Sequence, residues 1–336
     1  MINPTLGYVK INRFAESTFL EFEKSIENLL SEGASNLVLD LRDNPGGFLQ
    51  IAEQIADEFL EDGTLILFTK NKTNEIEKSF ATAKGRFEKA EVYVLINENS
   101  ASASEIVAGA LQDNDKGIII GRRSFGKGLV QQEMDLGDGS AIRLTTSRYY
   151  TPTGRSIQRS YDKGSEAYYD DYYQRLEHRA VDTLQSDFLA DSLKFTTPKG
   201  KIVYGGGGII PDVYVPYDAN FNNDIIEFLK ASGIMDFFVF EYLDSKRAKY
   251  TSLSETEFLA TFEISEAIYQ KFVSNFSDRM NMKNEEINPY KNAIEILLKS
   301  AFAKQLFGDN TAAKVLSTFD PMLQKTNDLE AVVISN

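Results

Sequence analysis

The segment EVYVLINENSASASEIVAGALQDNDKGIIIG, residues 91–121, encloses a helical pattern between two short apolar runs. EVYVLIN and GIIIG are predicted strands, because each is rich in the β-branched and apolar residues that strands favour. Between them, Ser102 and Glu105 have the spacing of a capping box at the start of a helix that ends near Asp113. Strand, helix and strand in this order are typical of an α/β fold.

The same alternation extends over the first 150 residues. LGYVKI, NLVLDL and LILFTK are further predicted strands, and NLVLDL is a continuous apolar run of the kind that buried strands show. TFLEFEKSIENLLSEG predicts a helix with a capping box from Thr18 to Glu21 and an end at Gly33. FLQIAEQIADEFL predicts another helix, and AIRLTTSRYYTPTG a long strand. We therefore expect an α/β core with a largely parallel sheet.

The pattern changes at about residue 155. Residues 160–203 are polar, tyrosine-rich and helical, and we interpret them as an insertion into a core that spans residues 1–218. The tyrosines between residues 168 and 173 alternate with acidic residues, which favours a solvated helix face.

Residues 219–336 show helical patterns only. Asn223 or Asp224 is the expected cap of the first helix, and Ser254 with Glu257 forms a capping box further on. This part is predicted to be a C-terminal helical domain.

Composition excludes several classes of function. The 336 residues carry a formal net charge of −14, which argues against nucleic acid as a partner, because its phosphates require clustered Lys and Arg. Cysteine is absent, so disulfides, thiolate nucleophiles and Cys-ligated metals are excluded. The single histidine, His178, argues against a histidine-rich metal site. We expect neither a metal nor a cofactor.

Three serines, Ser100, Ser102 and Ser104, stand at alternate positions before the central helix. A serine hydroxyl becomes a nucleophile only when a base takes its proton. His178 lies in the polar insertion, where we interpret it as an exposed surface residue. Ser102 is either a helix cap or a nucleophile that uses the free N–H groups of the helix start. These local arguments do not choose among the three serines.

Lysine is the alternative base, provided that burial in an apolar setting keeps its amine uncharged. GRRSFGKGLVQQ, residues 121–132, offers such a setting for Lys127. Glycines flank this residue, and Phe125 and Leu129 are placed to exclude water. Gln131 follows four residues later, on the same face of an extended strand, where its amide could hold the amine.

Five blocks together resemble the carboxy-terminal processing, or tail-specific, serine peptidases. They follow the order of that family and span roughly residues 7–216. The blocks are DLRDNPGG (40–47), NSASASEIVAGALQD (99–113), SFGKGLVQ (124–131), TTSRYYTPTGRSIQ (145–158) and GGGGIIPDVYVP (205–216).

The resemblance assigns roles to residues of these blocks. It implies that Ser102 is the nucleophile, that Lys127 is the base and that Gln131 orients the amine. Backbone N–H groups of Gly46 or Gly47 and of Ala103 would form the oxyanion hole. Asp113, at the end of the same helix, would be a supporting residue.

The resemblance also implies a Clp protease/crotonase-like core, here with a C-terminal helical region. No PDZ domain is recognised ahead of Leu6, so the chain resembles a catalytic core without that domain. The insertion and the helical tail are similar to versions from the Bacteroidetes.

The implied function is that of a serine endopeptidase that cleaves C-terminal regions of exported or misfolded proteins, in the periplasm or cell envelope. Protein or peptide substrates would bind through extended C-terminal segments, and a homo-oligomer is possible. The alternatives are a non-catalytic peptide- or ligand-binding module on the same fold, and a latent core that lacks its PDZ domain.

Overall fold

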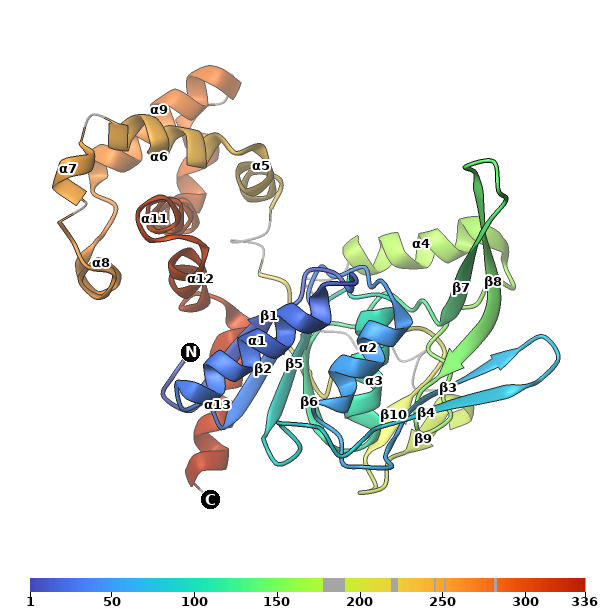
Figure 1. Cartoon of the computed structure of the whole chain (residues 1–336). Coiled ribbons are helices and arrows are strands. Elements are labelled where there is room, and N and C mark those ends of the chain that lie inside the picture. Colours follow the sequence, from blue (N-terminus) through green and yellow to red (C-terminus); the bar gives the residue numbers. More distant parts are fainter. Residues whose placement is uncertain (178–190, 219–222, 245, 251, 281–282, 336) are drawn as a thin grey trace. The chain divides into compact units, whose positions relative to one another are not determined.

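The computed structural model describes residues 1–177, 191–218, 223–244, 246–250, 252–280 and 283–335. Contacts between residues divide the chain into two compact units, Met1–Pro216 and Tyr217–Asn336 (Figure 1). His178 and residues 179–190 of the expected insertion lie outside the described residues, so their interpretation stays a prediction.

A five-stranded sheet forms the centre of the first unit, and each pair of neighbouring strands is parallel. Its strands are, in spatial order, β1 (Leu6–Lys10), β2 (Asn36–Asp40), β5 (Val92–Ile96), β6 (Gly117–Gly121) and β11 (Val213–Tyr214). The α/β architecture with a parallel sheet is therefore confirmed.

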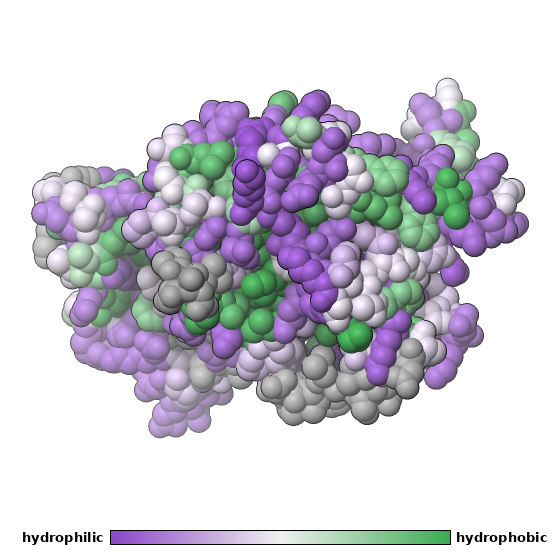
Figure 2. Space-filling model, turned by 90° about the horizontal axis from the view of Figure 1, so that it is seen from below, coloured by the Kyte–Doolittle hydropathy of each residue, from purple (hydrophilic) through white to green (hydrophobic). Residues whose placement is uncertain are grey.

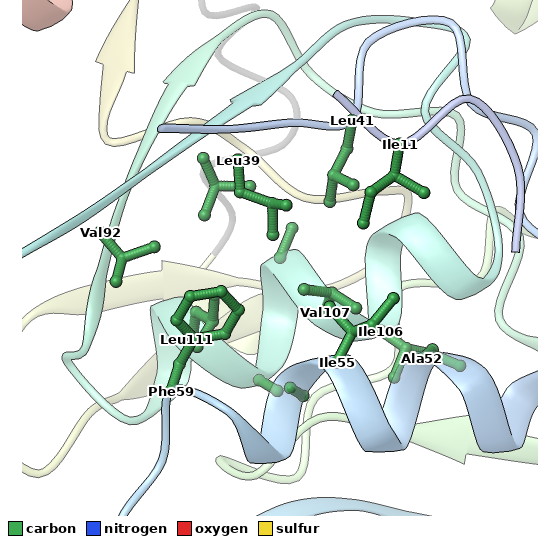
Figure 3. Packing of buried hydrophobic residues seen from close by; sticks show 14 of the residues in the cluster. Ile11, Leu39, Leu41, Ala52, Ile55, Phe59, Val92, Ile106, Val107 and Leu111 are labelled. Carbon is green, nitrogen blue, oxygen red and sulfur yellow. The ribbon is translucent and has the colours of Figure 1, made fainter. Parts of the chain in front are cut away.

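Three helices pack around this sheet: α1 (Thr18–Ser31), α2 (Leu49–Asp57) and α3 (Ala103–Asp113). Every residue of α3 is buried. Figure 3 shows the reason, because Val107 and Leu111 of α3 lie between Leu39 on the strand side and Ile55 and Phe59 near α2. Burying one such side chain contributes about 1.5–3 kcal/mol, which fixes the position of the helix that follows Ser102.

The capping box predicted at Thr18 is wrong. Ser17 precedes the first helical residue and makes no side-chain cap hydrogen bond. The Thr18 hydroxyl instead donates to the carbonyl oxygen of Arg13 and accepts from the N–H of Ala15. The Thr18 hydroxyl therefore stabilises the turn at residues 13–18 and does not cap the helix.

A second sheet, which the strand predictions did not separate from the first, is antiparallel. In spatial order it contains β4 (Ile76–Phe80), β3 (Leu65–Asn71), β8 (Ala141–Tyr150) and β7 (Leu129–Asp135). The hairpin of β7 and β8 projects from the rest of the unit (Figure 1). A small antiparallel pair joins β9 (Lys194–Thr196) to β10 (Ile202–Tyr204), after a short 3₁₀ turn, Asp191–Leu193.

The described part of the insertion contains one helix, α4 (Gly164–Glu177). Two of its four tyrosines form the solvated face that the sequence indicated, and two do not. Tyr168 is buried and Tyr172 is half-buried, whereas Tyr169 and Tyr173 are exposed. Residues four apart lie on the same face of a helix, so one pair turns toward the core and the other toward solvent.

The second unit is helical, as expected. Asn223 caps its first helix with a side chain that accepts from two N–H groups, and Ser254 with Glu257 forms the predicted capping box. The helices are α5 (Asp224–Ser232), α6 (Ile234–Asp244), α7 (Arg247–Tyr250), α8 (Glu255–Thr261), α9 (Glu266–Met280), α10 (Asn284–Ile287), α11 (Lys291–Phe307), α12 (Asp309–Ser317) and α13 (Pro321–Ser335), with a 3₁₀ turn at Asn288–Tyr290. Aromatic side chains such as Phe258, Phe272 and Phe302 fill its core.

Hydrophilic residues occupy most of the face shown in Figure 2, with apolar residues scattered between them. Of the helices that the structure describes, none combines the length and the apolar character that crossing a bilayer requires.

Candidate active site

The three alternating serines lie in the turn between β5 and α3, and their hydroxyls have different surroundings. Ser100 Oγ donates to the carbonyl oxygen of Leu41 at 2.8 Å, and Ser104 Oγ donates to that of Asn44 at 2.9 Å. Both side chains are fully buried. Ser102 is half-buried, and its hydroxyl donates no hydrogen bond to another described residue. Ser100 and Ser104 hold the turn together, whereas the Ser102 hydroxyl keeps its proton available.

Ser102 has a backbone conformation that few residues other than glycine adopt, with φ +56° and ψ −113°. Such a conformation costs of the order of 1–3 kcal/mol and persists only where the surrounding structure enforces it, often at functional sites. Ser102 is also the N-cap of α3, as its spacing from Glu105 predicted. Its side chain therefore stands where the first N–H groups of the helix have no partner within the helix.

Glu105 joins the serine turn to the loop that carries the lysine. One carboxylate oxygen accepts from the N–H groups of Ser102 at 2.9 Å and Lys127 at 2.8 Å. The other accepts from the N–H of Gly126 at 2.7 Å and from the Ser124 hydroxyl at 2.5 Å. Burial raises the pKa of the Glu105 carboxyl, while these hydrogen bonds act in the opposite direction. A single buried side chain thus fixes two segments that are far apart in the sequence.

Tyr149 of β8 makes a second link between the same segments. Its hydroxyl lies 3.2 Å from the carbonyl oxygen of Ser102 and 3.0 Å from that of Lys127. The ring is buried. Ser102 and Lys127 are therefore held close together through their backbones, independently of their side chains.

Lys127 is half-buried, so solvent still reaches a side chain that the sequence had placed in an enclosed setting. Its Nζ donates to Oε1 of Gln131, which is exposed, at 3.4 Å. Nζ makes no hydrogen bond to Ser102 among the described residues. Phe125 packs against Tyr172, with 5.2 Å between the ring centroids. In this arrangement the amine is directed to Gln131, and catalytic hydrogen bonds are often loose before substrate binds.

The turn at Asn44–Gly47 lies directly against Ser102. A Cβ atom added to Gly46 would stand 2.8 Å from Ser102 Cβ and 2.9 Å from the nitrogen of Ala103, so the close approach requires glycine. The Gly46 N–H donates to the side chain of Asn44 at 2.9 Å. Within the described residues the N–H groups of Gly47 and Ala103 make no hydrogen bond. Of the three predicted oxyanion donors, these two are available.

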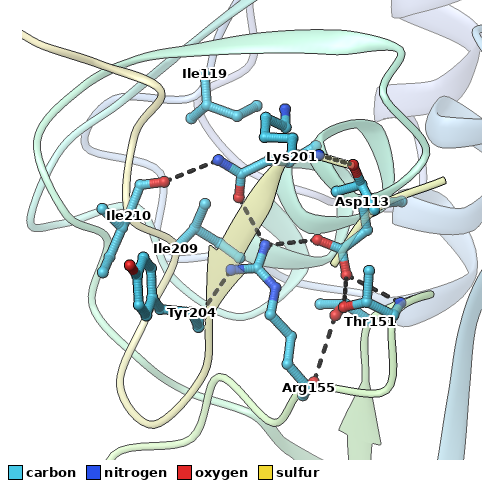
Figure 4. Close-up of polar contacts among 12 residues, drawn as sticks. Asp113, Ile119, Thr151, Arg155, Lys201, Tyr204, Ile209 and Ile210 are labelled. Atoms are coloured by element: carbon cyan, nitrogen blue, oxygen red, sulfur yellow. Dashed lines mark hydrogen bonds and ion pairs between the residues drawn. The ribbon is translucent and has the colours of Figure 1, made fainter. Parts of the chain in front are cut away.

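Asp113 lies at the opposite end of α3 from Ser102, roughly 16 Å away at the rise of an α-helix. It accepts from Arg155 at 2.7 Å and from the N–H and hydroxyl of Thr153 at 3.1 and 2.6 Å (Figure 4). Asp113 and Arg155 are both fully buried. Asp113 therefore braces the far end of the helix and does not contact the other candidate residues.

Sequence reasoning missed the roles of Glu105 and Tyr149. The Ser102–Glu105 spacing was recognised as a capping box, but the other two N–H donors to Glu105 come from Gly126 and Lys127, which no local pattern connects to it. The tyrosine pair at the end of a predicted strand carried no signal that one hydroxyl would reach two carbonyl groups.

We expect Glu105→Gln to destabilise the first unit by about 1–3 kcal/mol, the cost of leaving a buried donor without an acceptor. The amide NH₂ would face N–H groups, so at least one of the four donors loses its partner. Thermal unfolding followed by calorimetry measures the effect. Glu133→Gln, on the exposed β7 strand, is the matched control. Equal melting temperatures for the two variants would contradict the role of Glu105.

Comparison with known proteins gives matches to both units. Residues 5–164 match the model of peptidase family S41, and residues 226–308 match DUF8443, a family of unknown function. The carboxy-terminal-processing protease of Bartonella bacilliformis is 44% identical over 157 residues, which is 46% of this chain and 36% of that protein. The corresponding protease of Picosynechococcus sp. is 40% identical over 154 residues, 46% of this chain and 37% of that protein.

A solved structure, the photosystem II D1 C-terminal processing protease, is 35% identical, with 46% of this chain and 39% of that chain covered and a TM-score of 0.43. The chain spans little more than a third of the length of the curated relatives that it matches.

Proposed function

Because residues 5–164 of this chain match the model of peptidase family S41, we propose that it is a serine endopeptidase in which Lys127 activates Ser102. The observation that carries the proposal is the state of the Ser102 hydroxyl. It stands on a strained turn at the start of a buried helix and donates to no described residue, while both neighbouring serines are committed to structural bonds. Glu105 and Tyr149 hold the lysine loop beside it.

The proposed reaction is acyl transfer. The uncharged amine of Lys127 takes the proton of the Ser102 hydroxyl, and the oxygen attacks the carbonyl carbon of a peptide bond. The N–H groups of Gly47 and Ala103 stabilise the negative charge on the carbonyl oxygen. The lysine ammonium then protonates the departing amine. Water, deprotonated by the same lysine, hydrolyses the acyl-enzyme and restores Ser102.

A resting form of this enzyme is favoured by one observation. Among the described residues, Lys127 Nζ donates a hydrogen bond to Gln131 and none to Ser102. We propose that substrate, or a further domain of the protein, turns the amine from Gln131 toward Ser102. The chain would then be a latent form of the peptidase rather than a binding module.

The proposed substrate is an extended C-terminal region of an exported or misfolded protein. Strand β7, which follows Lys127 and includes Gln131, is the last strand in its sheet, so its outer edge is not paired within that sheet. An extended peptide can add to such an edge through main-chain hydrogen bonds. A location in the periplasm or cell envelope is proposed from the family resemblance alone.

We expect a fluorophosphonate probe to label the chain covalently at Ser102, because labelling requires an activated hydroxyl. Peptide mapping by mass spectrometry locates the adduct. Ser102→Ala should abolish labelling, and Ser140→Ala, at an exposed position between β7 and β8, should leave it unchanged.

Labelling without cleavage of casein would indicate the latent form. A folded wild-type chain that stays unlabelled at every pH would instead favour the non-catalytic binding module, and the proposed function would be wrong.

A further inference from the structure

Helix α4 of the insertion binds the outer side of the loop that carries Lys127. The guanidinium of Arg175 donates to the carbonyl oxygen of Ser124 at 2.8 Å and to that of Phe125 at 3.1 Å. The Arg175 side chain is only 10% exposed, and Asp171, one turn earlier in the helix, lies 3.4 Å from it. A planar guanidinium that serves two consecutive carbonyl groups fixes their orientation as well as their position.

Aromatic and cationic contacts extend this attachment. The Phe125 ring packs against Tyr172 of α4, with 5.2 Å between centroids. The Arg159 guanidinium lies 4.3 Å from the centre of the Phe125 ring and 4.0 Å from that of Tyr168. The N–H of Arg159 donates to the carbonyl oxygen of Gly126 at 3.1 Å. Arg175 and Arg159 therefore bind the backbone of Ser124, Phe125 and Gly126, the three residues before Lys127.

The same helix also reaches the segment before the nucleophile. The Tyr172 hydroxyl donates to the side-chain oxygen of Asn99 at 2.6 Å. Asn99 in turn donates to Asp43 at 2.8 Å, in the turn that precedes Gly46 and Gly47. One helix thus contacts the lysine loop directly and is connected to the two other segments of the candidate site.

We propose that α4 is a positioning element for catalysis, and that Arg175 and Tyr172 hold the lysine loop in register with Ser102. This inference rests on the proposed function. Glu105 fixes the inner side of residues 124–127, and α4 fixes the outer side. The loop contains Gly126 and Gly128 and belongs to no strand or helix before Leu129, so contacts from neighbouring segments hold it in place. Besides Glu105 and Tyr149, α4 supplies such contacts. A general base displaced by about 1 Å loses on the order of 100-fold in rate.

The test compares Arg175→Ala with Arg175→Lys in the whole chain. We expect Arg175→Ala to lower kcat for a fluorogenic peptide by about 10- to 100-fold with KM nearly unchanged. The rate of fluorophosphonate labelling at Ser102 should fall by a similar factor. Arg175→Lys should recover part of the loss, because an ammonium can still donate to one of the two carbonyl oxygens. Gln174→Ala, exposed on the same helix, is the matched control.

Tyr172→Phe removes only the hydroxyl that reaches Asn99, and should give a smaller loss in the same direction. If Arg175→Ala melts at a much lower temperature than the wild type, its kcat and labelling rate are measured below its melting transition. The kcat of Tyr172→Phe then provides a second test of the inference. Wild-type kcat and labelling rates in folded Arg175→Ala and Tyr172→Phe would overturn the inference. The proposed function would survive that result, because it is tested separately by labelling of the wild type at Ser102 and by the activity of Lys127→Ala.

Discussion

Lys127→Ala is expected to lower peptide cleavage by about 10²- to 10⁴-fold, the usual contribution of a general base. Lys127→Arg should be equally inactive, because a guanidinium keeps its charge and cannot accept the serine proton. Rates on a fluorogenic peptide, or fluorophosphonate labelling where cleavage is latent, measure the effect.

The control for this experiment is Lys72→Ala, an exposed lysine in the turn between β3 and β4. It removes the same charge from the molecule without touching the candidate site, so its rate should match the wild type. Near-normal cleavage by Lys127→Ala would rule out a lysine base at this position.

Arg155→Ala is expected to destabilise the first unit by about 3–5 kcal/mol, because it leaves the buried carboxylate of Asp113 without its counter-charge. Arg155 and Asp113 are fully buried and 2.7 Å apart, and Arg155 also donates to Gln112 and to the carbonyl oxygen of Tyr204 at 2.6 and 2.7 Å. Figure 4 shows these bonds converging on one guanidinium. Differential scanning calorimetry, which reports the unfolding of both units, measures the loss.

Arg143→Ala is the matched control, since Arg143 forms an ion pair of the same length, 2.7 Å, with Glu133 on the β7–β8 hairpin. Both side chains of this ion pair are more than half exposed, and such a pair contributes about 0–1 kcal/mol to the free energy of unfolding. The double variant Arg155→Met with Asp113→Asn should recover part of the stability, because no unpaired charge stays buried. A similar melting temperature for Arg155→Ala and Arg143→Ala would contradict the role of Asp113 as a brace.

The order of elements in the first unit followed from the sequence because each signal is local. The continuous apolar runs of β2, β5 and β6 and the capping spacing at Ser102 lie within a few residues. The antiparallel sheet of β4, β3, β8 and β7 did not follow, since β3 pairs with a strand that begins 76 positions after it, at Ala141 against Leu65. Pairing between distant strands is decided by packing, and no short pattern records it.

The candidate site shows the same division. Residue types and spacing singled out three serines, one lysine and a glycine turn, and the family resemblance pointed to Ser102. The tertiary structure decides which groups are left unbonded, because their partners come from distant segments: Ser100 and Ser104 bond residues 59 and 60 positions away. The tertiary structure also pairs the Gly46 N–H with the side chain of Asn44, so this N–H cannot serve the oxyanion hole. It turns Tyr168 and Tyr172 toward the core.

By itself, the sequence determined an α/β core followed by a helical region, excluded thiol chemistry, and placed a serine at a helix start 25 positions before a glycine-flanked lysine. Only the tertiary structure decided that this serine keeps a free proton, that Glu105 ties it to the lysine loop, and that α4 covers the loop. The physical reason is that periodicity and capping depend on neighbours in the chain. Burial and the saturation of hydrogen bonds depend on neighbours in space.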